Sequence, residues 1–340
     1  INLSLEKISF KLDPKKMSLF LETKKPNVVY NGILIPTQNI KVYIDFLSLL
    51  QTNFKIKKIN ITLEELNTRE IYELSSFIKP SNFKSFLNNN IKEGKLISKI
   101  EMFFNEEGVF ENYIAKGSIK NFEAEFFKEI NITKTNFDFF ADKNDILIKN
   151  IFGEISEIKI SDGDIKLNLE NGLLLNSNFN SKFKIDKNFL NNYKKYFKNY
   201  DLVNNVDEIQ GNIKNSFFIN FDKTYKLKEY NYSLTGDINK GKFIFIKPFK
   251  SKFVEEEIKE FYISNFKIKS IFSKENKKFT GSGEYSFNNL NFNKINLEQS
   301  FKKNLLKLNL NFVYRNSFNL EIINYKKKKN SVANVALNLE

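Results

Sequence analysis

The chain contains no cysteine, no histidine and no tryptophan among its 340 residues. The absence of cysteine excludes disulfides, thiol nucleophiles and cysteine-ligated metals. The absence of histidine removes the commonest general base, the usual metal ligand and the ordinary catalytic triad. The sequence also has no glycine-rich phosphate loop and no nucleophile elbow. We therefore expect a protein that is not an enzyme, with no cofactor and no metal site.

Arginine is almost as scarce, since it occurs only at Arg69 and Arg315 although the net charge is +14. Bidentate recognition of bases and phosphates favours arginine, so the sequence disfavours a nucleic-acid partner. If nucleic acid did bind, the affinity would fall steeply with salt. Lysine, asparagine, isoleucine and phenylalanine are abundant throughout, which indicates a general compositional bias. We assign the lysines to solvated faces, with an anionic membrane surface as the alternative.

Long apolar runs are missing as well. No segment approaches the ~18 to 20 apolar residues that cross a bilayer, and no signal peptide is visible. The chain begins and ends inside alternating patterns, so we expect a segment of a longer protein whose anchor or leader lies outside it. The lack of cysteine fits a compartment in which stray thiols are a liability.

Alternation of apolar and polar residues is the dominant pattern, and the stretch 40–63 shows it best. Ile40, Val42 and Ile44 alternate with polar neighbours, which predicts a strand with one buried face. The alternation returns at 54–56, is interrupted by Lys57 and Lys58, and continues from Ile59. Such a slip would turn later side chains to the other face unless one extra residue forms a β-bulge. The same spacing occurs at Leu3, Leu5, Ile8 and Phe10, at Phe54, Ile56, Ile59 and Ile61, and at Leu290, Phe292, Ile295 and Leu297.

Helical spacing is clearest in two inserts. Thr68 is the candidate N-cap of a helix that Pro80 ends, and Asp186 is the candidate N-cap of a second helix reaching Tyr200. The predicted order is strands in 1–65, a helical insert in 66–93, strands in 94–186, a second insert in 187–208, and strands in 209–340. We expect these to form one continuous elongated domain.

Two carboxylate groups are candidates for acid–base work or cation binding. Asp162 and Asp164 flank a glycine in a predicted turn, where aspartate is favoured for backbone reasons. Glu255, Glu256 and Glu257 form an acidic run that we assign to a solvated face. Neither group is predicted to be a site.

The predicted helices are too few to cover the apolar face of so many strands. Such a face must be covered in some way. Two solutions remain: the sheet folds on itself, or it curls into a trough that holds an apolar ligand.

One segment resembles the recurring element of the AsmA-like superfamily, especially its TamB and YhdP branches. The resemblance lies in the turn Ser48, Leu49 and Leu50 followed by the strand 54–61, and in the stretches GDIKLNLENGLLLNSNFNSKF (163–183) and YSLTGDINKGKFIF (232–245). It implies a mainly β protein with a long twisted antiparallel sheet, curled into an open groove, and a few short helices.

The resemblance also implies a function. Such proteins are tethered to the inner membrane, extend through the periplasm, and carry phospholipids between the inner and outer membranes of a Gram-negative envelope. The expected partners are phospholipid acyl chains, the membrane through segments outside this chain, and envelope proteins. The candidate groove-lining residues, with ordinary core as the alternative, are Leu3, Leu5, Ile8, Phe10, Ile40, Val42, Ile44, Phe46, Leu49, Leu50, Phe54, Ile56, Ile59, Ile61, Leu290, Phe292, Ile295 and Leu297. The alternative function is a scaffold for outer-membrane protein assembly that acts by β-strand pairing.

Overall fold

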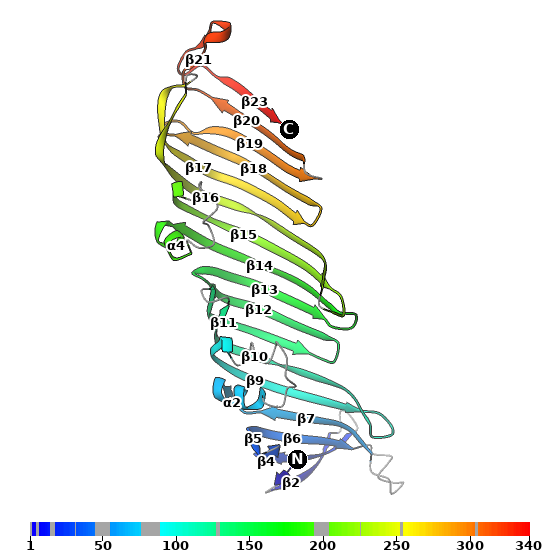
Figure 1. Ribbon diagram of the computed structural model, residues 1–340. Helices are drawn as coiled ribbons and strands as arrows, with labels where there is room; N and C mark the ends of the chain where they lie inside the picture. Colours follow the sequence, from blue (N-terminus) through cyan, green and yellow to red (C-terminus); the bar gives the residue numbers. More distant parts are fainter. Residues whose placement is uncertain are drawn as a thin grey trace. The chain divides into compact units, whose positions relative to one another are not determined.

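The chain folds mainly as β-structure, with 77% strand and 7% helix, in an antiparallel sheet that stays open (Figure 1). The computed structural model describes residues 2–4, 7–13, 18–30, 32–44, 55–75, 89–126, 130–193, 204–224, 226–251, 254–302 and 305–340. The predicted fold class is therefore confirmed: mainly β, antiparallel and open, with few short helices.

Contacts divide the chain into two units. Unit 1 comprises residues 1–156 and 161–174, and unit 2 comprises 157–160 and 175–340. The strands of unit 1 are β1 (Asn2–Ser4), β2 (Ile8–Asp13), β3 (Ser18–Lys24), β4 (Asn27–Tyr30), β5 (Ile33–Ile35), β6 (Thr37–Ile44), β7 (Ile56–Leu63), β8 (Leu66–Asn67), β9 (Ile91–Phe104), β10 (Phe110–Phe126), β11 (Ile130–Ala141), β12 (Asp145–Ile155) and most of β13 (Ile158–Asn168). β1, β4 and β5 form a small separate sheet.

Unit 2 contains most of β14 and all later strands. They are β14 (Leu173–Asp186), β15 (Val206–Phe221), β16 (Leu227–Ser251), β17 (Val254–Ser273), β18 (Asn276–Phe287), β19 (Asn293–Lys302), β20 (Leu305–Tyr314), β21 (Phe318–Leu320), β22 (Tyr325–Lys327) and β23 (Ala333–Leu339). β21 and β22 pair with each other as a small hairpin around the 3₁₀ turn η3 (Glu321–Ile323).

Strand order follows the sequence in both units, and the elements that lie between paired strands, such as β4 and β5 between β3 and β6, do not interrupt it. In unit 1 the antiparallel pairing runs through β2, β3, β6, β7, β9, β10, β11 and β12. In unit 2 it runs through β15, β16, β17, β18, β19, β20 and β23. This arrangement agrees with the meander that the closely spaced strands predict.

The two described helices lie within the predicted inserts. α2 spans Thr68–Ser75, but its cap is Asn67 rather than the predicted Thr68: the Asn67 side chain accepts hydrogen bonds from the Arg69 and Glu70 amides at 3.0 and 3.2 Å. α4 spans Lys187–Asn192, and Asp186 caps it as predicted. β9 begins at Ile91 and β15 at Val206, slightly before the predicted ends of the inserts. The rest of the second predicted helix lies outside the described residues.

β-bulges hold the apolar side chains on one face where the alternation slips. In β17 the apolar positions change from Phe261 and Ile263 to Phe266 and Ile268, and the extra residue Asn265 has a positive φ of 48°. Similar shifts in pairing accompany the positive φ angles of Asn121, Lys134 and Asn150 in β10, β11 and β12. Each bulge therefore cancels a phase slip in the sequence.

The structure tests two sequence predictions at sites where the alternation of apolar and polar residues is interrupted. The predicted bulge at the lysine pair is confirmed, because the register of β6 and β7 shifts between the Tyr43–Lys58 and Ile44–Ile56 pairs. The predicted turn at Asp162 is wrong, because β13 continues through it and Asp162 has a positive φ of 50°. Aspartate tolerates a positive φ because its short polar side chain can hydrogen-bond locally, so it is suited to this position within the strand. Aspartate is also common in turns, which is why the sequence predicted a turn here.

The bulge at Asn265 predicts a contrast between two substitutions. Asn265→Gly should leave the free energy of unfolding nearly unchanged, because glycine adopts a positive φ readily. Asn265→Val should lower it by about 1 to 2 kcal/mol, because a β-branched residue is strained there. Urea unfolding followed by circular dichroism measures both, and equal stability of the two variants would contradict the role of the bulge.

Candidate functional site

One face of unit 2 is apolar from strand to strand. Directly paired positions form a row that crosses seven strands: Ile213, Gly236, Ile268, Gly281, Leu297, Leu310 and Leu337. The adjacent positions, which point to the other side, form the row Asn212, Asp237, Lys267, Ser282, Asn296, Asn311 and Ala336. We call the first side the apolar face of unit 2 and the second side its polar face.

Unit 1 has the same division between its two faces. Its apolar face carries the row Ile8, Thr23, Ile40, Ile61, Ile100, Ala115, Ala141 and Ile146, which crosses eight strands. Its polar face carries the row Ser9, Glu22, Lys41, Asn60 and Glu101. Each unit therefore presents one continuous apolar surface of its own.

Many side chains of these apolar faces remain accessible to solvent. In unit 2, Leu306 and Leu337 are 47% and 46% exposed, and in unit 1, Ile8 and Phe10 are 52% and 73% exposed. Of the two described helices, α4 packs on β15 and α2 on β5, β8 and β9. Exposed apolar surface of this extent marks an interaction surface.

A stack of aromatic rings extends along the apolar face of unit 2. The rings of Phe179 and Phe217 are centred 5.8 Å apart, Phe217 and Tyr232 4.3 Å, and Tyr232 and Phe272 6.0 Å. The Tyr232 hydroxyl donates a hydrogen bond to the Asn215 side-chain oxygen at 2.9 Å, and burial raises the pKa of Tyr232. The tyrosine thus keeps its polar end paired, and its ring adds to the apolar surface.

The apolar face of unit 2 deepens into a pocket of about 380 Å³. Its floor includes Phe312 and Val335, which are paired across β20 and β23. Phe318 and Tyr325 of the β21–β22 hairpin form another wall. The volume lies in the range of small-molecule and lipid-chain sites, and the lining is apolar except for one lysine, Lys327.

Lys327 is a buried cation at the edge of this pocket, with 5% of its surface exposed. Its Nζ donates to the carbonyl oxygens of Asn316 and Lys328 at 2.9 and 3.2 Å, and it lies 5.6 Å from the centre of the Tyr314 ring. Burial, together with the positive charge of Arg315, lowers the pKa of Lys327. The ammonium group therefore provides a positive charge beside an apolar volume.

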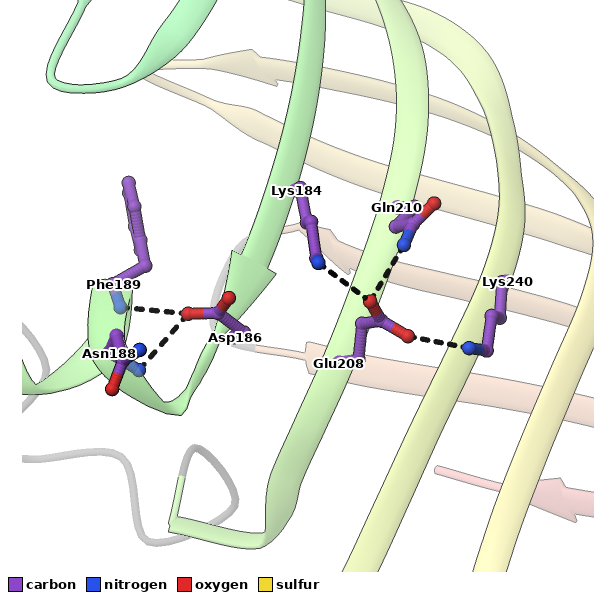
Figure 2. A network of polar contacts seen from close by, with 7 residues as sticks. All are labelled: Lys184, Asp186, Asn188, Phe189, Glu208, Gln210 and Lys240. Atoms are coloured by element: carbon purple, nitrogen blue, oxygen red, sulfur yellow. Dashed lines mark hydrogen bonds and ion pairs between the residues drawn. The ribbon is translucent and has the colours of Figure 1, made fainter.

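The polar faces are covered by lysine–glutamate–lysine bridges between three neighbouring strands. Figure 2 shows one in unit 2, where Glu208 pairs with Lys184 at 3.3 Å and with Lys240 at 2.6 Å. The hydrogen bonds from Lys240 and Gln210, with that from Lys184, lower the pKa of Glu208 to about 2. The charges therefore neutralise one another along the polar face.

Unit 1 contains two bridges of the same kind. Glu22 pairs with Lys11 and Lys41, and the hydrogen bond from Lys11 lowers its pKa. Glu101 pairs with Lys58 at 3.4 Å and with Lys116 at 3.2 Å. These bridges place lysines on solvated sheet faces, as the composition predicts.

The structure brings together most of the predicted lining residues that it describes. Ile8, Phe10, Ile40, Val42, Ile44, Ile56, Ile59 and Ile61 occupy the apolar face of unit 1, and Ile295 and Leu297 that of unit 2. Leu290 and Phe292 lie in the connection before β19 instead of in a strand. Leu3 belongs to the small sheet through β1. Leu5, Phe46, Leu49, Leu50 and Phe54 lie outside the described residues.

Sequence analysis missed the pocket residues near the end of unit 2. Phe312 and Val335 belong to strands that follow the alternating pattern, so the pattern identifies their face but not the pocket. The pocket exists because the β21–β22 hairpin packs beside them, and sequence spacing does not predict that contact. The lysine run 326–329 was the available signal, since the pocket cation Lys327 lies within it.

Two of the candidate carboxylates form ion pairs with lysines. Glu256 pairs with Lys329 at 2.5 Å, and Glu257 pairs with Lys250 at 3.3 Å. The described residues contain no group of three or more acidic side chains placed to hold a metal ion. Among the described helices, none has the length and apolar character that a bilayer crossing requires.

Comparisons with protein-family models, with curated proteins and with solved structures found no match to this chain.

Acid should weaken the bridge at Glu208. The pKa of this carboxyl is about 2 in the folded chain against an ordinary 4.5, so its ion pairs stabilise the fold above pH 4.5 and are lost as the pH falls towards 2. The expected contribution at neutral pH is below about 1 kcal/mol, because the lysines are largely solvated.

The free energies of unfolding of the wild type and Glu208→Gln test this expectation. The wild type should be more stable at pH 7, and the difference should shrink between pH 4.5 and pH 2. Glu107→Gln, in the exposed turn between β9 and β10, is the control. A difference that stays constant with pH would contradict the bridge.

Proposed function

We propose that this chain is a segment of a bridge-like lipid transport protein. Its apolar sheet faces would carry phospholipid acyl chains between the inner and outer membranes of a Gram-negative envelope. The observation that carries the proposal is the row of directly paired apolar residues that crosses strand after strand on one face, where Leu306 and Leu337 are 47% and 46% exposed. A row of this kind offers a moving acyl chain a mainly apolar surface.

The energetics of such a surface suit acyl chains. Each methylene group that leaves water gains about 0.8 kcal/mol, and this gain needs no directional contact. Leucine, isoleucine and phenylalanine therefore suffice as lining, which accords with a chain that lacks histidine and cysteine. The flat aromatic stack of Phe217, Tyr232 and Phe272 would serve as one part of the track.

The pocket in unit 2 would hold one acyl-chain segment at a time. Its apolar lining supplies the contact, and Lys327 at its edge supplies a positive charge for an anionic headgroup. Lysine interacts with phosphate as a point charge, which suits headgroups of different shape. The positive excess of the chain supports the same assignment.

The wider setting is part of the proposal. We assign the chain to the AsmA-like superfamily, with a periplasmic location and a tether to the inner membrane outside this segment. This assignment is supported by the resemblance of the stretches 163–183 and 232–245 and by the open antiparallel sheet. We propose no enzymatic activity, no cofactor and no nucleic-acid partner.

A scaffold for outer-membrane protein assembly is the second candidate. One observation favours it: β23 pairs with β20 on one side and has no second partner strand among the described residues. Its sequence, ANVALNL, contains no charge or proline that would block a further strand. A partner would then be captured by strand addition at this edge, independently of any lipid.

Two substitutions on adjacent residues test the transport proposal. Leu297→Asp places a charge on the apolar face, and Asn296→Asp places the same charge on the polar face. We expect Leu297→Asp to reduce co-purifying phospholipid about tenfold, since a charge cannot contact acyl chains favourably. Asn296→Asp should retain the lipid. Mass spectrometry of extracted lipid measures both.

Folding must be checked in the same experiment. Circular dichroism should give equal strand content for both variants, and Val335→Trp, which fills the pocket instead of adding a charge, should lower lipid content at unchanged fold. Equal lipid content in Leu297→Asp and the wild type would contradict the proposal. Unfolding of Leu297→Asp together with no co-purifying lipid in the wild type would instead assign the apolar face to ordinary core.

A further inference from the structure

A small hairpin projects from one end of unit 2 (Figure 1). Its arms are β21 and β22, paired from Phe318–Lys327 to Leu320–Tyr325, and its tip is the 3₁₀ turn η3. Asn324 closes the turn with a positive φ of 50°, and its amide donates to the Glu321 carbonyl at 3.1 Å. The tip therefore has a defined backbone conformation.

The tip exposes apolar side chains to an unusual degree. Ile322 is 90% exposed and Ile323 is 68% exposed, and Tyr325 beside them is 50% exposed. Among the described residues, no large apolar side chain is more exposed than Ile322. Single exposed apolar residues are common on proteins, but two consecutive isoleucines at a projecting tip form a distinct apolar point.

Basic residues surround the arms and base of this hairpin. The segment 315–332 contains five basic residues and one acidic residue, Glu321. Lys326, Lys328 and Lys329 are exposed. An apolar point flanked by tyrosine and lysine matches the layers of a membrane interface, where apolar groups enter the acyl region and cations stay with anionic headgroups.

The base of the hairpin is firmly attached to the sheet. Lys327 donates to the Asn316 carbonyl at 2.9 Å, Lys329 pairs with Glu256 at 2.5 Å, and Arg315 donates to the Asn293 side chain at 3.0 Å. These contacts tie the base of the hairpin to β17 and β19, while Ile322 and Ile323 at the tip stay exposed. The isoleucines are thus presented outward by the fold.

We propose that this hairpin docks the chain on an anionic lipid bilayer, with Ile322 and Ile323 inserted and the exposed Lys326 and Lys328 at the headgroups. The contact goes beyond the transport proposal and does not depend on it. Tyr325 and Lys327 of the same hairpin also line the apolar pocket. Docking would therefore bring the pocket beside the membrane surface.

Because the chain contains no tryptophan, the fluorescence of one introduced tryptophan reports only on its own surroundings. Ile322→Trp creates a single tryptophan at the tip, and its fluorescence should shift to shorter wavelength with vesicles of phosphatidylglycerol and phosphatidylcholine in equal parts. Val109→Trp places the single tryptophan at another exposed site, in unit 1, and should show no shift. Vesicles of phosphatidylcholine alone should give a weaker response in the tip variant.

Sedimentation with the same vesicles measures the effect of the tip on affinity. The double variant Ile322→Asp and Ile323→Asp should bind anionic vesicles about tenfold or more weakly, and Val109→Asp should bind like the wild type. Both tip residues are solvent-exposed, so folding should be preserved, and circular dichroism verifies it.

Three outcomes would overturn the docking proposal. They are equal binding of the tip variant and the wild type, equal binding of the wild type to neutral and anionic vesicles, and a tip-dependent change of oligomeric state without lipid. The last outcome would identify a second copy of the chain as the occupant. Lipid content of Leu297→Asp is measured without vesicles, so failure of docking and failure of transport are separate results.

Discussion

The structure depends on one constraint: every strand must keep its apolar side chains on the same side along its whole length. Side chains alternate with a period of two, so one extra residue reverses all that follow. β16 and β17 span 25 and 20 residues, which is far longer than an average strand. Bulges such as that at Asn265 absorb the extra residues, and both faces keep their character from one end of a strand to the other.

Alternation in the sequence was sufficient to predict the mainly β fold and the membership of one face. Ile40, Val42, Ile59 and Ile61 were assigned to that face from spacing alone, and their pairing confirms that they share it. The bulge at the lysine pair was predictable because apolar residues flank it at the right distance. The pocket was not predictable, because it arises where a distant hairpin packs beside β20 and β23, and no local pattern encodes that contact.

The two faces of the sheet differ in chemistry: one carries charged and polar side chains, and the other carries apolar side chains. On the polar face, glutamates pair with lysines of neighbouring strands, as Glu208 does with Lys184 and Lys240. The apolar face has no such internal solution, because side chains such as Leu306 and Leu337 remain exposed on it. The proposed occupant is therefore an apolar molecule, and the basic hairpin at the end of unit 2 supplies a means to approach its source.

Strand order that follows the sequence has a consequence for unfolding. Within the seven paired strands from β15 to β23, each strand exchanges backbone hydrogen bonds only with its immediate neighbours. Stability is then distributed as a chain of neighbour interactions, as in repeat proteins, instead of being concentrated in one central core. β23 has a described partner strand on one side only, so its amide protons should exchange with solvent sooner than those of β17, which lies between two long strands. The sheet would open from its edge inwards, one strand after another.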